Sequence, residues 1–200
     1  MYPVAKRLLD VLGASLLLLL LSPLLAVVAL AIWGIDGRPV LFTQVRAGRG
    51  GAPFRLVKFR TLEPGPKDPT RPAAHTTRLG GPLRRWAIDE LPQLWNVLRG
   101  EMSLVGPRPV PLSQAERYGP RERRRLRVRP GITGWAQVQG RNALSWPERI
   151  EHDRWYVRHR SLWIDLRILA RTPLILLRGT GVYGPDGRTP SFSSPPDPNA

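Results

Sequence analysis

A run of 25 residues near the N-terminus, 11–35, carries no charged side chain. As a straight helix this run would be roughly 37 Å long, which exceeds the ~30 Å hydrocarbon core of a bilayer. Apolar runs longer than about 18 residues are typical of membrane helices rather than of helices in small soluble domains. The chain is therefore expected to be a membrane protein.

Two arrangements of this run have features against them. A cleaved signal peptide is suggested by Lys6 and Arg7 before the run and by Ala-Leu-Ala at 29–31, but the run is long for a signal peptide and many Arg and Lys residues follow it. A single spanning helix would have positive residues on both flanks, whereas such residues favour the cytoplasmic side.

A re-entrant hairpin places both flanks on one side of the membrane. Ser22 and Pro23 lie near the middle of the run, and proline removes one helix hydrogen bond and clashes with the preceding turn. Each half would be roughly 18 Å long, close to one leaflet. Ser22 is able to donate to a carbonyl that Pro23 leaves free. The residues alone leave the spanning helix open, because proline also kinks true spanning helices.

The charge balance points to an anionic partner. Lys and Arg number 31 against 15 Asp and Glu, a net charge of +16. A membrane surface, nucleotide phosphates or nucleic acid would suit such a surplus. The chain has no cysteine, which excludes disulfides, thiolate metal sites and cysteine nucleophiles.

The remaining residues predict an α-rich α/β fold with a small β region. Strands are expected at 40–42 and 54–59 around a glycine turn, and one helix near 83–98. Prolines argue against regular structure over 103–111, whereas 112–128 and two segments between 147 and 179 are predicted to be helical. We expect a membrane hairpin at 1–36, one domain at 37–178 and a disordered tail at 179–200.

The last predicted helix is unusually apolar. It packs either in the core or in the membrane interface, and Trp155, Tyr156 and Trp163 are residue types that suit the interface.

Asp89 and Glu90 are the only adjacent pair of acids in the chain. Nearby arginines are expected to favour the ionised form of Asp89, which would make it a nucleophile or a metal ligand. Neighbouring carboxylates on a helix point about 100° apart and therefore suit two different roles, such as nucleophilic attack by one and Mg²⁺ ligation by the other. The alternative is that two acids near a helix start offset its dipole.

Basic residues in two other segments are candidates for holding phosphate. Arg108 lies in the rigid sequence Gly-Pro-Arg-Pro at 106–109, where its guanidinium is able to bind phosphate through two hydrogen bonds. Lys58 and Arg60 alternate with Phe59, which would place both cations on one side of a strand. The alternatives are a proline-rich connector and a solvated face.

Taken in order, these motifs resemble the bacterial sugar transferase family, in the short form of the monotopic polyprenyl-phosphate phosphoglycosyl transferases. The resemblance covers roughly residues 5–178. It rests on Lys6-Arg7 with Asp10, the Ser22-Pro23 break, Lys-Phe-Arg-Thr at 58–61, the block from Asp89 to Ser103, Val-Gly-Pro-Arg-Pro at 105–109, the block 129–138 and Gly-Arg-Asn at 140–142.

The resemblance implies a two-step phosphoryl transfer in a catalytic domain with interfacial helices. The aspartate would attack the sugar-linked phosphate of a UDP-sugar, releasing UMP, and polyprenyl phosphate would then take the phosphosugar. By position, Asp89 is the nucleophile, and Glu90 is its Mg²⁺-associated partner, with both carboxylates as metal ligands. The residues implied in substrate or phosphate binding are Lys58, Arg60, Arg84, Arg108, Pro109, Arg129, Arg141 and Asp153.

The resemblance also implies a re-entrant hairpin, a bacterial inner-membrane location and a cytoplasmic catalytic domain. The expected partners are a UDP-sugar, polyprenyl phosphate and anionic lipid headgroups. A homodimer is compatible with the sequence, which does not fix the oligomeric state. The chain departs from the family pattern at Val45, Trp86 and Ala87, of which Trp86 could bear on the choice of sugar.

Two functions of other classes compete with this interpretation. A membrane-anchored nucleic-acid binder would need its arginines along one exposed stripe with stacking aromatics, whereas here they are spread through loop motifs. No nucleic-acid partner is therefore expected. A catalytically silent scaffold for glycan-assembly proteins is disfavoured by the intact Asp89-Glu90 pair.

Overall fold

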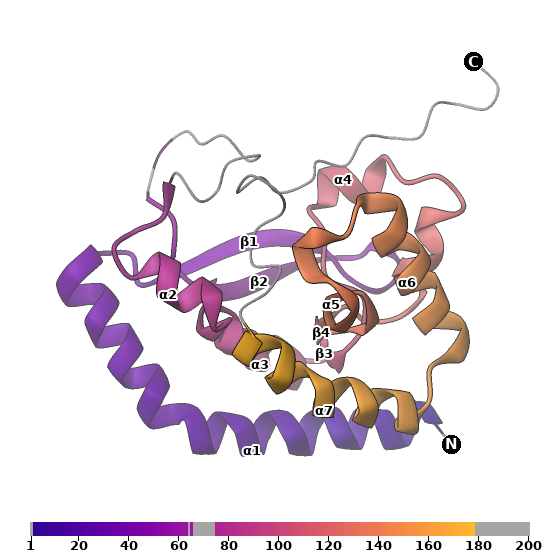
Figure 1. Ribbon diagram of the computed structural model, residues 1–200, viewed down its shortest axis with the longest axis horizontal. Coiled ribbons are helices and arrows are strands. Elements are labelled where there is room, and N and C mark those ends of the chain that lie inside the picture. The colour runs from indigo at the N-terminus through magenta and orange to yellow at the C-terminus, as the bar shows by residue number, and fades with distance from the viewer. Residues whose placement is uncertain (1, 64, 66–74, 179–200) are drawn as a thin grey trace.

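The computed structural model describes residues 2–63, 65 and 75–178 of the 200-residue chain. The predicted disordered tail at 179–200 lies outside the described residues. Within them the fold is rich in helix, with two small two-stranded sheets and a long helix along one side (Figure 1).

The N-terminal helix α1 spans Tyr2–Ala31 and continues into a π-helical turn, η1, at Ile32–Asp36. It passes through Pro23 without ending, although its ribbon turns part-way along its length (Figure 1). Ser22 Oγ donates to the carbonyl of Leu19 at 2.8 Å, which is the carbonyl that Pro23 cannot reach for lack of an N–H. The structure therefore has one long apolar helix where two shorter helices were predicted.

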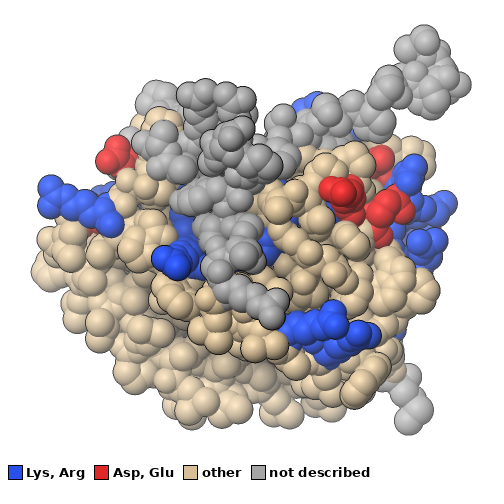
Figure 2. Space-filling view, in the orientation of Figure 1, with Lys and Arg blue, Asp and Glu red and all other residues tan. Residues whose placement is uncertain are grey.

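Only three residues of α1 are buried, and its exposed side is apolar. Within the described residues, one helix, Tyr2–Asp36, is long and apolar enough to cross a membrane, and only 11% of its most apolar window is buried. The lower margin of the molecule, where α1 lies in Figure 1, is almost free of charged residues in Figure 2. A core helix of a soluble protein would be mostly buried, so this exposure fits association with a membrane.

The β region forms a hairpin, as predicted. Strand β1, Leu41–Ala47, pairs antiparallel with β2, Pro53–Phe59, around the short helix η2 at Arg49–Gly51. Gly50 and Gly51 have φ angles of 70° and 86°, a left-handed conformation that glycine adopts without strain.

The predicted helix over 83–98 is wrong as a single element. The segment forms α2 at Gly80–Arg85, the 3₁₀ helix η4 at Ile88–Gln93 and α3 at Leu94–Leu98. Ala87, between the first two, has a left-handed φ of 55°, which an α-helix does not accommodate. Helical periodicity in the sequence did not reveal this break.

The prediction of no regular structure over 103–111 is wrong for its first residues. Strand β3, Ser103–Val105, pairs in parallel with β4, Gly131–Thr133. The two chains approach so closely that a Cβ on Gly131 would lie 2.1 Å from the backbone nitrogen of Gly106. Glycine at 131 is therefore required, and the pairing brings together two motifs that are separate in sequence.

The C-terminal half is helical, with one predicted helix broken. The segment 112–128 forms α4, Leu112–Glu116, and the 3₁₀ helix η5, Glu122–Arg127. After α5, Trp135–Gln139, and the short 3₁₀ helix η6, Arg141–Ala143, the two predicted helices follow as α6, Trp146–His159, and α7, Leu162–Arg178.

The aromatic residues near α7 divide between core and surface. Trp163 is 73% exposed, whereas Tyr156 is only 2% exposed and lies in the main apolar core. The expectation that Tyr156 suits a membrane boundary is therefore wrong. Its hydroxyl donates to Asp165 Oδ1 at 2.7 Å, so the polar end of the ring is satisfied inside the protein.

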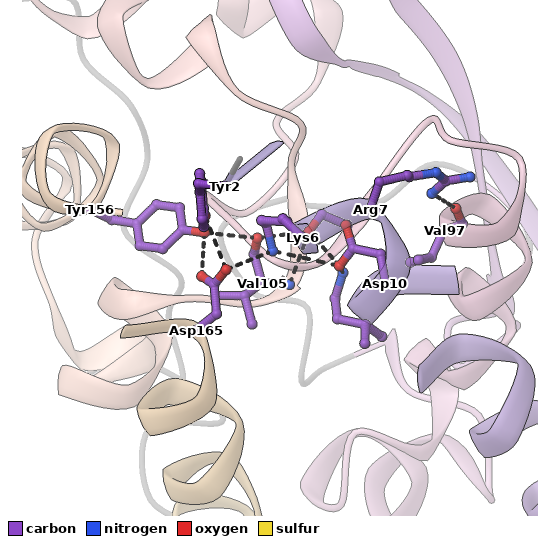
Figure 3. A network of polar contacts seen from close by, with 10 residues as sticks. Tyr2, Lys6, Arg7, Asp10, Val97, Val105, Tyr156 and Asp165 are labelled. Carbon is purple, nitrogen blue, oxygen red and sulfur yellow. Dashed lines mark hydrogen bonds and ion pairs between the residues drawn. The ribbon is translucent and has the colours of Figure 1, made fainter. Parts of the chain in front are cut away.

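A buried polar network joins the start of α1 to the rest of the fold (Figure 3). Lys6 Nζ lies 3.1 Å from Asp165 Oδ2 and 3.5 Å from Asp10 Oδ1. Asp10 accepts hydrogen bonds from the backbone N–H of Leu104 and from Ser103 Oγ, both at 2.9 Å. These contacts attach α1 to β3 and α7.

Replacing Asp10 with alanine should lower the free energy of unfolding by about 3 kcal/mol. The substitution leaves the Leu104 N–H and the Ser103 hydroxyl buried without their acceptor, and it removes one of the two carboxylates that face Lys6. The measurement is the thermal unfolding midpoint of detergent-purified protein. Glu63→Ala removes an exposed acid and is the matched control. Equal midpoints for the two variants would show that the network does not stabilise the fold.

Candidate active site

Asp89 and Glu90 lie in η4, directly after the left-handed Ala87. Asp89 is 4% exposed, and β2 packs against η4. In a 3₁₀ helix adjacent side chains point about 120° apart, so the two carboxylates face different surroundings. Backbone strain of this kind is often found at functional sites.

Glu90 forms a two-pronged ion pair with Arg108. Arg108 Nη1 donates to Glu90 Oε2 at 2.9 Å, and Arg108 Nη2 donates to Glu90 Oε1. Burial alone would raise the pKa of Glu90, but Arg108, with help from Lys58 and Arg141, lowers it to about 2. Glu90 is therefore ionised throughout the physiological range.

Asp89 has the opposite environment. Burial and the neighbouring Glu90 carboxylate raise the pKa of Asp89 to about 6, although Lys58, Arg108 and Arg84 act to lower it. The expectation that nearby cations would favour its ionised form is therefore wrong in its net direction, because desolvation outweighs them. Asp89 makes no hydrogen bond or ion pair with the residues that the structure describes, which leaves its oxygens available.

Cations from four parts of the chain surround this pair. The pKa of Lys58 is lowered by burial despite the attraction of both carboxylates, and its Nζ lies 5.5 Å from the centre of the Phe42 ring. Burial also lowers the pKa of Arg141, against the pull of the same acids. The fold thus brings Lys58, Arg84, Arg108 and Arg141 within electrostatic reach of the dyad.

Asp153 acts on this site through a second arginine. Arg125 is 3% exposed; its Nε donates to Asp153 Oδ2 at 2.9 Å and its Nη2 to the carbonyl of Arg108 at 2.9 Å. The Tyr118 hydroxyl accepts a third hydrogen bond from Arg125 at 2.8 Å. This buried cluster fixes the backbone of Arg108, so Asp153 has a positioning role in this geometry.

Pro109 contributes its backbone. Its carbonyl accepts a hydrogen bond from Arg46 Nη1 at 3.3 Å, which links the Arg108 loop to β1. Neither Pro109 nor Asp153 has a cationic side chain, so in this geometry both support the Arg108 loop instead of binding phosphate by charge.

Two predicted phosphate ligands are engaged elsewhere. The Arg60 guanidinium donates to the carbonyls of Asp36, Gly37 and Arg38. Arg129 Nε donates to the carbonyl of Gly100 at 2.7 Å, just after α3. For both residues the geometry supports a structural role instead of phosphate binding.

Two partly buried arginines near Arg108 were not predicted as site residues. Burial and the nearby Arg108 lower the pKa of Arg46 to about 10, and the same two causes, with Arg125, lower that of Arg149 to about 10. Arg46 lies on β1, and its Nη1 donates to the carbonyl of Pro109 in the Arg108 loop. Its position on a strand that pairs with the Lys58 strand is the sequence signal that could have found it.

The three departures from the family pattern lie in different settings. Val45 is 46% exposed on β1, and Trp86 is 42% exposed next to the dyad segment. Ala87 provides the left-handed turn before it.

The donor set at the dyad fits a hard divalent cation that is shared with substrate. No group of three or more acidic or histidine side chains is placed to hold a metal ion within the described residues. Mg²⁺ is usually bound by only one or two carboxylates together with substrate phosphates. Asp89 is the freer of the two carboxylates, because both oxygens of Glu90 accept hydrogen bonds from Arg108.

Comparison with known proteins identifies the family of the chain. The family model of the bacterial sugar transferases matches residues 1–179. The sugar transferase EpsL of Bacillus subtilis (strain 168), described as uncharacterized, is 45% identical over 186 residues, which cover 90% of each chain. An uncharacterized sugar transferase of Haemophilus influenzae is 38% identical over 90% of this chain, which spans only 42% of that relative.

A relative in Caulobacter vibrioides is named for an activity. This UDP-glucose:undecaprenyl-phosphate glucose-1-phosphate transferase is 46% identical over 191 residues, covering 89% of this chain and 72% of the relative. The matched residues include the apolar helix α1, the dyad and the Arg108 loop. The chain therefore belongs to the bacterial sugar transferase family.

Proposed function

We propose that this protein transfers a sugar-1-phosphate from a UDP-sugar to undecaprenyl phosphate and releases UMP. The observation that carries the proposal is the buried Asp89 carboxylate, unpaired among the described residues, beside a Glu90–Arg108 ion pair and within reach of further cations. The relatives named for this type of reaction include the transferases of Caulobacter vibrioides and Klebsiella pneumoniae. The product would serve as the first membrane-bound unit of a glycoconjugate or polysaccharide.

In the first step Asp89 acts as the nucleophile. One carboxylate oxygen forms a bond to the sugar-linked phosphorus, and the bond from that phosphorus to the oxygen of UMP breaks. UMP leaves with the electron pair, and the sugar phosphate stays on Asp89 as a mixed anhydride. Lys58, Arg84 and Arg108 supply positive charge where negative charge develops.

In the second step an oxygen of undecaprenyl phosphate attacks the same phosphorus. The bond to Asp89 breaks, and the carboxylate is regenerated. Glu90 is a poor proton acceptor because its pKa is about 2. Its role in this proposal is to remain charged and to hold Arg108 in place, and it would help to hold a bound metal ion near the incoming phosphate.

We propose Mg²⁺ as the cofactor, held by Asp89, Glu90 and substrate phosphate oxygens. When bound, it neutralises phosphate charge and orients the phosphates for in-line attack.

We further propose that α1 is re-entrant and that the catalytic domain is cytoplasmic at the bacterial inner membrane. Both ends of α1 contact the same globular body. Asp10 near its start bonds β3, while Val28 and Ile32 near its end pack with Phe59 and Leu83. A helix that spans the membrane would carry its two ends to opposite sides, so contact at both ends favours entry and exit on one side.

Helix α7 is proposed to lie in the membrane interface beside α1. Five of its large apolar residues are exposed together with Arg167, whereas Asp165 and Ile168 face the protein. Trp at position 163 is a residue type that is enriched at membrane interfaces. The exposed apolar residues of α7 are Leu162, Trp163, Leu166, Leu174 and Leu177.

Replacing Asp89 with asparagine should reduce UMP release at least about a thousandfold, because the amide is a poor nucleophile towards phosphorus. The assay follows UMP from UDP-glucose, UDP-galactose and UDP-N-acetylgalactosamine with undecaprenyl phosphate and Mg²⁺, and mass spectrometry searches for the phosphosugar adduct on intact protein. Chelation of the metal should stop turnover in the same assay.

The exposed acid Glu116 provides the matched control, and Glu116→Gln should retain full activity. Membrane association should be equal in both variants and the parent chain. Turnover that survives Asp89→Asn would exclude the covalent mechanism. If the folded parent chain releases no UMP from any of the three UDP-sugars, the scaffold interpretation is favoured.

The first step should lose rate as the pH falls through about 6. Attack requires the ionised carboxylate, and burial raises the pKa of Asp89 to about 6 from its ordinary value near 4. The measurement is single-turnover UMP release without undecaprenyl phosphate, from about pH 5 to about pH 8, so that the lipid phosphate does not titrate. In Arg108→Gln the fall in the rate of UMP release should begin at a higher pH, because Arg108 lowers the pKa of Asp89.

The membrane topology is testable because the chain has no cysteine of its own. Single cysteines in Val4→Cys and Gly34→Cys, at the two ends of the apolar helical segment, should both react with a membrane-impermeant maleimide only when the cytoplasmic face is accessible. Labelling of the two positions from opposite sides would establish a spanning helix instead. Ser22→Cys is the reference: under the proposed topology position 22 lies within the hydrocarbon core, so it should stay unlabelled from both sides.

A further inference from the structure

A second basic site lies apart from the dyad, between η5 and α6. Its pocket, of about 120 Å³, is lined by Arg124, Arg127, Arg154, Val157 and Arg158. The volume is well above what one water molecule needs. None of these arginines is among the cations that act on Asp89 or Glu90.

The pocket gathers more positive charge than the surrounding protein neutralises. Arg124, Arg127 and Arg158 make no hydrogen bond or ion pair with the part of the chain that the structure describes. Arg154 donates to Glu151 at 2.6 Å, but its buried Nε has no partner, and Glu151 is shared with Arg121. Like charges held together repel one another, so this arrangement favours a bound anion.

The chemistry of the pocket suits a phosphate group. Guanidinium groups bind phosphate oxygens through paired, charge-assisted hydrogen bonds. Four of them, from two elements, surround a single pocket here, with the apolar Val157 beside them. A ligand that carries both a phosphate and apolar chains would match both features.

The location favours a lipid. Arg158 lies in the last turn of α6, and α7 begins four residues later with Leu162 and the 73%-exposed Trp163. Tyr2, at the start of α1, donates to Asp165 in the first turn of α7 (Figure 3), so the two exposed apolar helices meet near this point. The pocket thus adjoins the surface that we assign to the membrane.

We infer that the pocket between η5 and α6 binds the headgroup phosphate of an anionic phospholipid. This inference rests on the proposed membrane placement but not on the proposed reaction. The bound headgroup fixes the right-hand end of the molecule in Figure 1, where α6 meets α7, against the bilayer surface. Retention of this lipid is separate from the binding of undecaprenyl phosphate at the dyad.

The test uses the full chain in vesicles of equal parts phosphatidylglycerol and phosphatidylethanolamine, released for native mass spectrometry. The parent chain should retain phosphatidylglycerol at least about tenfold over phosphatidylethanolamine. Arg124→Gln combined with Arg127→Gln should lose that preference. Arg49→Gln combined with Arg78→Gln removes the same charge from exposed sites elsewhere and should keep it.

Further measurements distinguish a lipid phosphate from a soluble phosphate, and the proposed lipid site from the proposed reaction. Addition of inorganic phosphate or UMP should not displace the lipid; displacement would assign the pocket to a soluble phosphate and overturn the inference. Equal loss of preference in both double variants would overturn it too, since only net charge would then matter. UMP release is measured in the same preparations and should be unchanged, so a failed lipid test with intact activity leaves the proposed reaction standing. Arg158→Gln repeats the test if the double variant unfolds early.

Discussion

The buried contact between Asp10 of α1 and β3 supports the rest of the structure. Polar groups removed from water must find partners, and here one carboxylate satisfies a backbone N–H and a hydroxyl of β3 while facing Lys6. Strand β3 in turn pairs with β4 and leads directly into the Arg108 loop. The position of the apolar helix α1 and the position of the arginine that pairs with Glu90 are thereby linked through one short strand.

The two acids of the dyad show how environment separates adjacent side chains of similar chemistry. The ionised Glu90 carboxylate is paired with Arg108 through two hydrogen bonds. Asp89 is buried with cations nearby, but none of them is in contact with it. Their pKa values therefore move in opposite directions, to about 2 and about 6. A carboxylate that is buried and unpaired is better suited to attack than one held in an ion pair, which matches the roles proposed for them.

Among the basic residues that the structure describes, three groups have different consequences. Arg7, Arg60 and Arg129 bind backbone carbonyls and stabilise local structure. Those around the dyad lie where substrate phosphates are proposed to bind. Those between η5 and α6 have little local neutralisation and adjoin the apolar surface. A net charge of +16 is thus not a uniform surface property: the first group binds backbone carbonyls, and the other two groups are proposed to bind different phosphates.

The sequence by itself determined the apolar helix, the glycine-turn hairpin, the two C-terminal helices and the dyad, because each depends on residues close together in the chain. It also identified Lys58, Arg84, Arg108 and Arg141 among the residues that the fold gathers. Only the tertiary structure decided the break at Ala87, the pairing of β3 with β4 and the engagement of Arg60 and Arg129 with carbonyls. It also decided the net direction of the Asp89 pKa, since desolvation depends on what packs around a carboxylate and not on its neighbours in sequence.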